Sequence, residues 1–176
     1  NSSTEIDLSS PTMVYASEYI YAATFDATTT PKKIRINKLN TELENVWAQT
    51  GVALTPENDQ RNVFLVDLGG VGVGCFWSES RSFLSGFDIF FQSLNPDGEP
   101  QLSSGGITVA ESNGDDYIQA VIPAPDGISF LVFWVEEVWP ASRLKYNRVD
   151  LNGQISTGWP PNGFNLSNQS IGADNL

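Results

Sequence analysis

A period of about 55 residues is the feature that most constrains how this chain can fold. One motif occurs three times: a large apolar residue, three spacers, a glycine, an apolar residue, any residue and a second apolar residue. Its glycines are Gly51, Gly106 and Gly163, which are 55 and 57 residues apart. An internal repeat of this length indicates one supersecondary unit that occurs several times and buries its core against its neighbours.

Two further landmarks keep the same order. An alternating apolar segment upstream of each glycine carries a side-chain amide, at Asn37, Gln92 and Asn147, with intervals of 55 residues. A run of apolar and small residues precedes each of these segments. The runs cover residues 19–25, 71–77 and 128–134. Because three landmarks agree in order and nearly in period, the chain holds three related units.

Each unit is predicted to form four short strands. In the third unit we place them at residues 117–122, 128–134, 143–149 and 164–166. Asp126-Gly127 is a strong hairpin signal, since glycine accepts a positive φ without a Cβ clash. Residues 150–153 and 95–98 predict a second turn that ends on glycine, whereas the first unit has Asn40-Thr41-Glu42 there. No segment of 12 or more residues has a clean helical period.

The expected fold is therefore all-β, with three four-stranded antiparallel blades of the β-propeller type. The blades are expected near residues 12–55, 61–110 and 117–167, and residues 1–11 repeat the end of a unit as a leading strand. Closed propellers have about four to eight blades, so three blades are too few. We expect the chain to be part of a propeller or to assemble into one, for example as a two-fold dimer of six blades. The alternative is an open stack that stands alone.

The second unit carries the most specific pattern. Residues 76–81 read FWSESR, residues 88–94 read DIFFQSL and residues 97–98 read DG. This pattern resembles a β-propeller repeat family of secreted and cell-surface bacterial proteins. The third unit keeps Trp134 and Glu136 but not the arginine, and the first has Phe25 in place of the tryptophan, with Asp26 nearby. The resemblance implies a propeller fold and a role in binding or display, without shared catalytic residues.

Composition excludes several classes of function. Asp and Glu outnumber Lys and Arg by 21 to 9, and the net charge of −12 argues against binding nucleic acid or anionic lipid. The chain has no His, which removes Ser-His-Asp and Cys-His nucleophiles and His-based zinc sites. No stretch approaches the ~20 apolar residues of a membrane span. The single cysteine, Cys75, lies in an apolar run and is expected to be a buried, inert thiol.

The sequence also bears on where the protein acts. It is rich in Asn, Ser, Thr and Gly, has no possible internal disulfide and has no signal peptide. It begins at Asn1, with Met13 as its only methionine, so we expect a trimmed or processed chain. A secreted, cell-surface or periplasmic location is expected. Glycosylation sequons occur at Asn1, Asn165 and Asn168.

The candidate ligand site lies in the loops after the second strand of each unit, which are predicted at residues 26–32, 78–86 and 135–142. These loops gather on one face of a propeller and combine charged with aromatic side chains, which suits a sugar. The candidate residues are Glu79, Arg81, Phe83, Glu136, Glu137 and Trp139, of which Trp139 is the aromatic most expected at the surface. The alternative is that Glu79 and Arg81 only order their loop.

Two other sets have mainly structural interpretations. The amides of Asn37, Gln92 and Asn147 are expected to satisfy backbone groups between blades. No cofactor is expected. The acidic turns offer weak Ca²⁺ candidates without EF-hand spacing, and turn chemistry alone explains them. Those candidates are Asp97, Asp115 and Asp116.

The function predicted from these features is a non-catalytic, extracytoplasmic binding module with carbohydrate as its ligand. One alternative is a structural subunit that joins copies of itself, or another propeller chain, through open blade edges. A second alternative is a glycoside-active enzyme, in which carboxylates such as Glu79 and Glu136 form the pair that this chemistry needs.

Overall fold

The computed structural model describes residues 12–26, 30–47, 50–55, 58–82 and 86–166. These residues form strands and no helix, which confirms the all-β prediction. The strands of the first sheet are β1 (Thr12–Ala16), β2 (Tyr19–Asp26), β3 (Lys33–Leu39) and β4 (Val52–Ala53). Those of the second are β5 (Asp59–Asp67), β6 (Val73–Ser82), β7 (Gly86–Leu94) and β8 (Ile107–Ala110). The third contains β9 (Asp115–Pro123), β10 (Ser129–Val138), β11 (Ala141–Asp150) and β12 (Phe164–Asn165).

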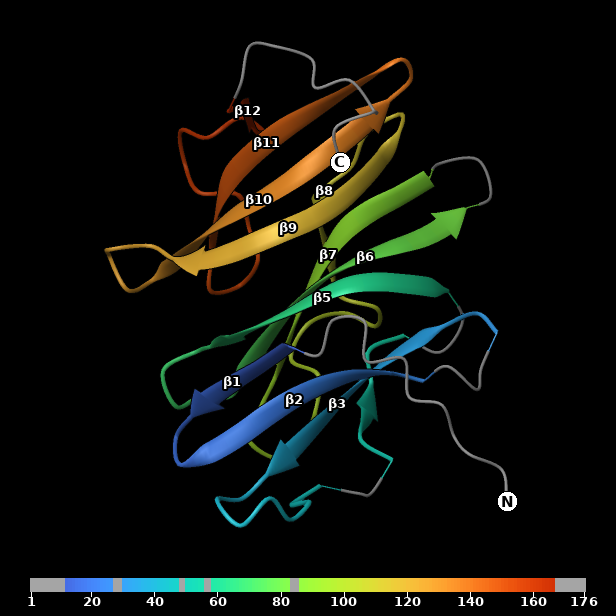
Figure 1. Cartoon of the computed structure of the whole chain (residues 1–176). Helices are drawn as coiled ribbons and strands as arrows, with labels where there is room; N and C mark the ends of the chain where they lie inside the picture. The colour runs from blue at the N-terminus through green and yellow to red at the C-terminus, as the bar shows by residue number, and fades with distance from the viewer. Residues whose placement is uncertain (1–11, 27–29, 48–49, 56–57, 83–85, 167–176) are drawn as a thin grey trace.

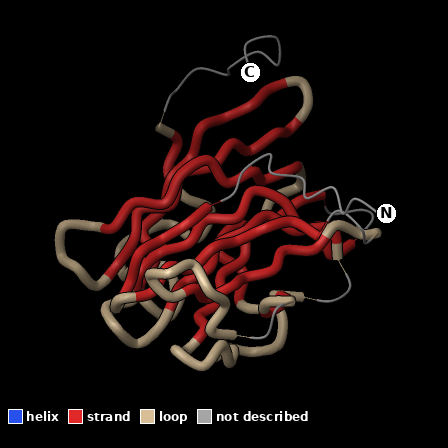
Figure 2. The backbone as a smooth tube through the Cα atoms, turned by 60° about the horizontal axis from the view of Figure 1, so that its bottom comes forward, coloured by secondary structure: helices blue, strands red, loops and turns tan. Residues whose placement is uncertain are grey.

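Each sheet is an antiparallel meander of four strands in chain order. The three sheets stack in sequence order, with β1–β4 at the bottom of Figure 1 and β9–β12 at the top. The tube in Figure 2 shows the same stack of strands from a second side. The described strands therefore form three blade-like sheets, and no sheet closes on itself. The leading segment 1–11 lies outside the described residues.

Every sheet has two different faces because side chains alternate along a strand. We call the face toward the preceding sheet the front face and the face toward the following sheet the rear face. The rear face of the first sheet, with Tyr21 and Ile36, packs on the front face of the second, with Cys75 and Trp77. The rear face of the second sheet then packs on the front face of the third. Two hydrophobic cores of the same design therefore lie between three sheets.

The turn between the third and fourth strands has the same geometry in each sheet. Its first residue accepts a side-chain hydrogen bond from the backbone N–H four residues later, at Asn40, Asn95 and Asp150. The residue after the turn centre has a positive φ, and this residue is Leu43, Gly98 or Gly153. The Gly-less turn of the first unit therefore keeps its shape by placing a leucine in the left-handed region.

This turn also joins neighbouring sheets, and we call it the plug turn. Gly98 lies over Trp47 and Val52 of the first sheet, and an added Cβ would be 3.1 Å from each. Lys38 Nζ and Trp47 Nε1 donate hydrogen bonds of 2.9 and 3.1 Å to the carbonyl of Pro96 in the same turn. The rear face of the first sheet therefore carries a socket for the plug turn of the second sheet.

The plug turn of the third sheet fits its socket more tightly. A Cβ on Gly153 would lie 2.4 Å from Phe91 and 2.7 Å from Ile107 of the second sheet. This distance is shorter than any real Cβ contact, so only glycine fits without movement of the ring. In the third unit, stacking against the second sheet therefore requires the glycine as well as the turn does.

Gly153→Ala is expected to destabilise the fold more than Gly127→Ala. Both glycines have a positive φ, of 77° and 71°, but nothing lies within 4 Å of a Cβ on Gly127. Each alanine costs about 1–2 kcal/mol in the left-handed region, and overpacking against Phe91 adds about 1–3 kcal/mol to the first. Denaturant unfolding of both variants measures the difference. Equal losses would contradict the socket at Phe91.

Candidate functional site

Four of the six candidate ligand residues lie in strands and not in loops, so the loop prediction is wrong for them, whereas Trp139 lies in the turn after β10. Strand β6 continues to Ser82 and β10 to Val138, which places Glu79, Arg81, Glu136 and Glu137 within hairpins. The hairpins extend past the apolar runs because polar residues there pair across the strands, as Glu136 does with Arg143. Phe83 lies outside the described residues.

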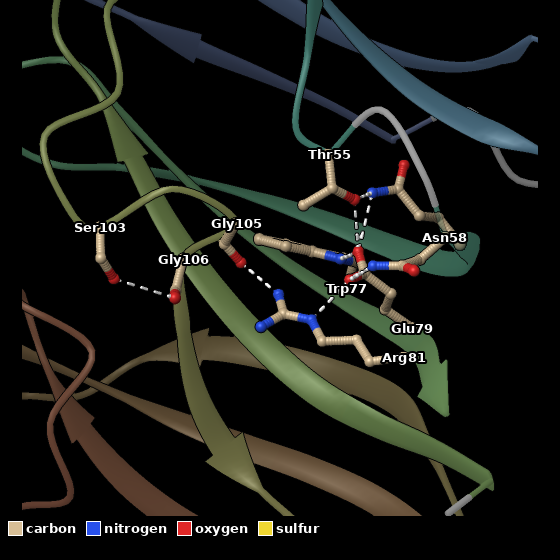
Figure 3. Close-up of polar contacts among 9 residues, drawn as sticks. Thr55, Asn58, Trp77, Glu79, Arg81, Ser103, Gly105 and Gly106 are labelled. Atoms are coloured by element: carbon tan, nitrogen blue, oxygen red, sulfur yellow. Dashed lines mark hydrogen bonds and ion pairs between the residues drawn. The ribbon is translucent and has the colours of Figure 1, made fainter. Parts of the chain in front are cut away.

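Glu79 is fully buried at the junction of the first and second sheets (Figure 3). Five side chains donate hydrogen bonds of 2.6 to 2.9 Å to its two carboxylate oxygens. The donors are Thr55, Asn58, Gln60, Trp77 and Arg81. Burial alone would raise the pKa of Glu79, but these hydrogen bonds outweigh it and hold the pKa below its usual value.

The geometry favours a structural role for Glu79. Thr55 follows the last strand of the first sheet, whereas Trp77 and Arg81 belong to the second, so the carboxylate ties the two sheets together. Arg81 also donates to the carbonyl of Gly105, and its guanidinium lies over the Phe90 ring. The pair of Glu79 and Arg81 is therefore part of a saturated network.

An acidic residue at this position recurs in every sheet. Asp26, Glu79 and Glu136 have equivalent partners on the third strand, at Lys33, Asp88 and Arg143. Each carboxylate has a cation: Arg35 lies 3.1 Å from Asp26, Arg81 lies 2.6 Å from Glu79, and Lys145 and Arg143 lie 2.8 and 3.1 Å from Glu136.

The same register corrects the alignment of the first unit. Thr24 pairs with Arg35 as Trp77 pairs with Phe90 and Trp134 with Lys145. Thr24, and not Phe25, therefore occupies the tryptophan position. Phe25 points to the opposite face, where it joins the core against the second sheet.

The first strand makes the second and third sheets differ. Gln60 lies opposite Glu79, donates to it, and accepts a 2.6 Å hydrogen bond from the backbone N–H of Ile34. Asp116 lies opposite Glu136 in the equivalent place. The third sheet thus has the carboxylate of Asp116 beside Glu136, where the second sheet has the neutral amide of Gln60 beside Glu79.

Asp116 is only 1% exposed, and neither of its carboxylate oxygens has a hydrogen-bond partner among the described residues. Burial, followed by the charge of Glu136, raises the pKa of Asp116 to about 7. The neighbouring Asp88 is also buried, and burial raises its pKa to about 6. Buried carboxylate oxygens without partners therefore occur on Asp116 of the third sheet and on Asp88 of the second, in contrast to the satisfied Glu79.

A cleft of about 540 Å³ opens beside this cluster. Its lining is mostly polar and comes from the segment before β9, the β10–β11 hairpin and the loop before β12. The lining residues are Glu111, Ser112, Asn113, Glu136, Val138, Arg143 and Asn162. Trp139 follows Val138 at the hairpin turn and is 89% exposed, which confirms it as a surface aromatic. Of the five ligand candidates that the structure describes, Glu136 lines the cleft and the other four do not.

Three of the cleft residues escaped the sequence argument: Glu111, Ser112 and Asn162. They lie in connecting segments whose residues do not match those of the corresponding segments in the other two units. Arg143 was placed only as the start of a strand. The signal that could have found it is its position opposite Glu136, which a hairpin with a turn at 139–140 fixes.

The amide residues have structural roles, but within sheets and not between them. Gln92 accepts from the backbone N–H of Leu102 and donates to the carbonyl of Ser103, both at about 3 Å. Asn147 donates to the carbonyl of Pro160 at 2.8 Å. The amides therefore hold the long loop between the third and fourth strands of their own sheet. Asn37 lies against Gly51 in the corresponding loop.

No group of three potential metal ligands occurs in the described part of the chain. Asp97 is exposed in a plug turn, and Asp115 accepts a 2.8 Å hydrogen bond from the backbone N–H of Phe87. Cys75 is fully buried, and burial raises the pKa of its thiol. Among the sequons, Asn165 is exposed in β12, and Asn1 and Asn168 lie outside the described residues. In the part of the chain that the structure describes, no helix is long and apolar enough to cross a membrane.

Asp116→Asn is expected to stabilise the protein at pH 8 and to have little effect at pH 4. An acid with a raised folded-state pKa holds its proton longer in the folded protein, so stability falls as pH rises from about 4 to about 7. The amide removes this loss and the repulsion with Glu136. Thermal unfolding at the two pH values measures it, with the exposed Asp97→Asn as the control for charge. A similar gain at both pH values would contradict the raised pKa.

Comparison with known proteins gives no relative for this site. No protein-family model, curated protein or solved structure matches the chain. The resemblance to a bacterial propeller repeat therefore stays a prediction from its motifs, and the function has to be argued from the side chains of the cleft.

Proposed function

We propose that this protein is a non-catalytic binding module that holds a carbohydrate in the cleft of the third sheet. The observation that carries the proposal is the combination of that cleft, lined by Glu111, Glu136 and Arg143, with an exposed Trp139 at the adjacent turn. An aromatic ring beside a few convergent polar groups is the usual composition of a small-molecule site.

The polar groups suit neighbouring hydroxyls. A carboxylate accepts two hydrogen bonds and a guanidinium donates several, so each can bind adjacent hydroxyl groups of one sugar ring. Asn113 and Asn162 add groups that both donate and accept. The indole of Trp139 offers a face on which the apolar C–H side of the ring can stack.

Two features support binding without catalysis. Glycoside hydrolysis needs two carboxyl groups that reach the substrate on either side of the bond. Glu79 is saturated by protein donors, and Asp116 lies beneath the surface. Of the two glutamates that line the cleft, Glu111 and Glu136, Glu136 is already paired with Arg143 and Lys145, which suits recognition of hydroxyls.

Arg143→Ala is expected to weaken glycan binding about 10- to 100-fold, since a hydrogen bond to a charged group contributes about 1.5–3 kcal/mol. Trp139→Ala is expected to weaken it about fivefold through lost stacking, worth about 1 kcal/mol. A glycan array identifies the ligand, and calorimetry on the wild type and variants measures affinity.

Arg35→Ala is the matched control, because Arg35 and Asp26 form the same 3.1 Å pair in the first sheet, away from the cleft. This variant should bind as the wild type does. An array without any bound glycan, or equal affinity for all three variants, would overturn the proposal.

A further inference from the structure

The stack leaves an aromatic socket open at its end. The rear face of the third sheet carries Phe133, Tyr146, Trp159 and Phe164, and no sheet follows it in the described chain. The rings of Tyr146, Trp159 and Phe164 lie 5.5 to 5.8 Å apart. Phe164 is 44% exposed and Leu166 is 53% exposed, so this face is apolar and accessible.

These residues occupy the socket positions of the other two sheets. Tyr146 pairs with Phe164 as Ile36 pairs with Val52 and Phe91 with Ile107. Trp159 stands in the repeat motif where Trp47 stands in the first unit. Trp47 packs under Gly98 and donates to the Pro96 carbonyl, whereas Trp159 Nε1 has no acceptor among the described residues. The third socket is therefore built like the two that are filled.

A matching plug stands open at the other end. The plug turn of the first sheet places Leu43 where the other sheets place Gly98 and Gly153, and no described sheet precedes it. Leu43 has φ of 64° and is 67% exposed. A leucine in this conformation costs backbone energy and gains no burial within the chain. Met13 and Tyr15 on the front face of the same sheet are also largely exposed.

We propose that a second copy of this chain docks head to tail, with the Leu43 plug turn of one copy in the Trp159 socket of the other. In this dimer the Leu43 turn of one copy contacts Trp159 of the other, as the Gly98 turn contacts Trp47 within the chain. An added Cβ would lie 3.1 Å from Trp47 and Val52 in the first socket, so the third socket has to admit the larger Leu43 side chain by movement of its Trp159 and Phe164 rings.

The repeat geometry also suggests the stoichiometry. Head-to-tail contacts form a closed ring if the rotation between copies closes and a filament if it does not. Two copies hold six sheets, which lies within the about four to eight blades of closed propellers, whereas three copies exceed it. A closed dimer with two identical contacts is therefore the expected assembly.

The test is the mass of the wild type in solution, measured by light scattering and sedimentation over a range of concentrations, beside Leu43→Lys and Trp159→Glu. The wild type should be a dimer, and each variant alone should be a monomer. An equimolar mixture of the two variants should associate again. One contact in that pair is wild type, and the other opposes Lys with Glu.

Val71→Lys is the matched control, because Val71 is 66% exposed in a turn of the middle sheet and lies on neither end face. It should remain a dimer, and circular dichroism should show that all variants are folded. A monomeric wild type would overturn the proposal. A dimer that Leu43→Lys leaves intact would also overturn it, because that result indicates contact between two third sheets.

Discussion

Each sheet of this protein depends on a neighbouring sheet that covers at least one of its faces. A four-stranded meander is too small to bury apolar side chains by itself, and here the burial comes from stacking. The two internal cores use the same positions, with Ala23 and Ile36 in the core that contains Trp77, and Phe76 and Phe91 in the core that contains Trp134. The plug turn adds a directional element to this burial, because it inserts only into the preceding sheet. A chain built in this way has two different ends.

The repeat also explains why the chemistry gathers in the third sheet. All three sheets place an acidic residue at the same position, and in the second sheet Gln60 and four other donors satisfy it. In the third sheet Asp116 replaces the glutamine and is itself unsatisfied. A repeat scaffold can absorb one such local loss because its neighbours keep their own contacts. The cleft beside Glu136 lies where the repeat rule is broken.

The three units could be predicted from the sequence because the backbone conformation requires particular residue types at the repeated positions. Gly106 needs a positive φ and lies against the Phe91 carbonyl and the Trp77 ring, so the motif is visible without a structure. Positions fixed by cross-strand pairing were harder. Phe25 resembled the missing tryptophan because it is aromatic, although the register assigns that place to Thr24. The loop assignment failed because charged strand ends have the composition of loops. The opposition of Asp116 and Glu136 depends on a register shift between Phe133 and Trp134, which no local pattern reveals.

The Glu79 network has a consequence for how the fold comes apart. It ties the end of the first sheet to the second by charge-assisted hydrogen bonds, whereas Asp116, which faces the second sheet from the third, has no hydrogen-bond partner among the described residues. In a linear array, the free energy of local opening depends on each junction separately. The third sheet is therefore expected to open first as the pH rises toward 7 and Asp116 ionises. Amide hydrogens of β9 and β10 would then exchange earlier than those of β2 and β6, although all four strands lie within cores of the same design.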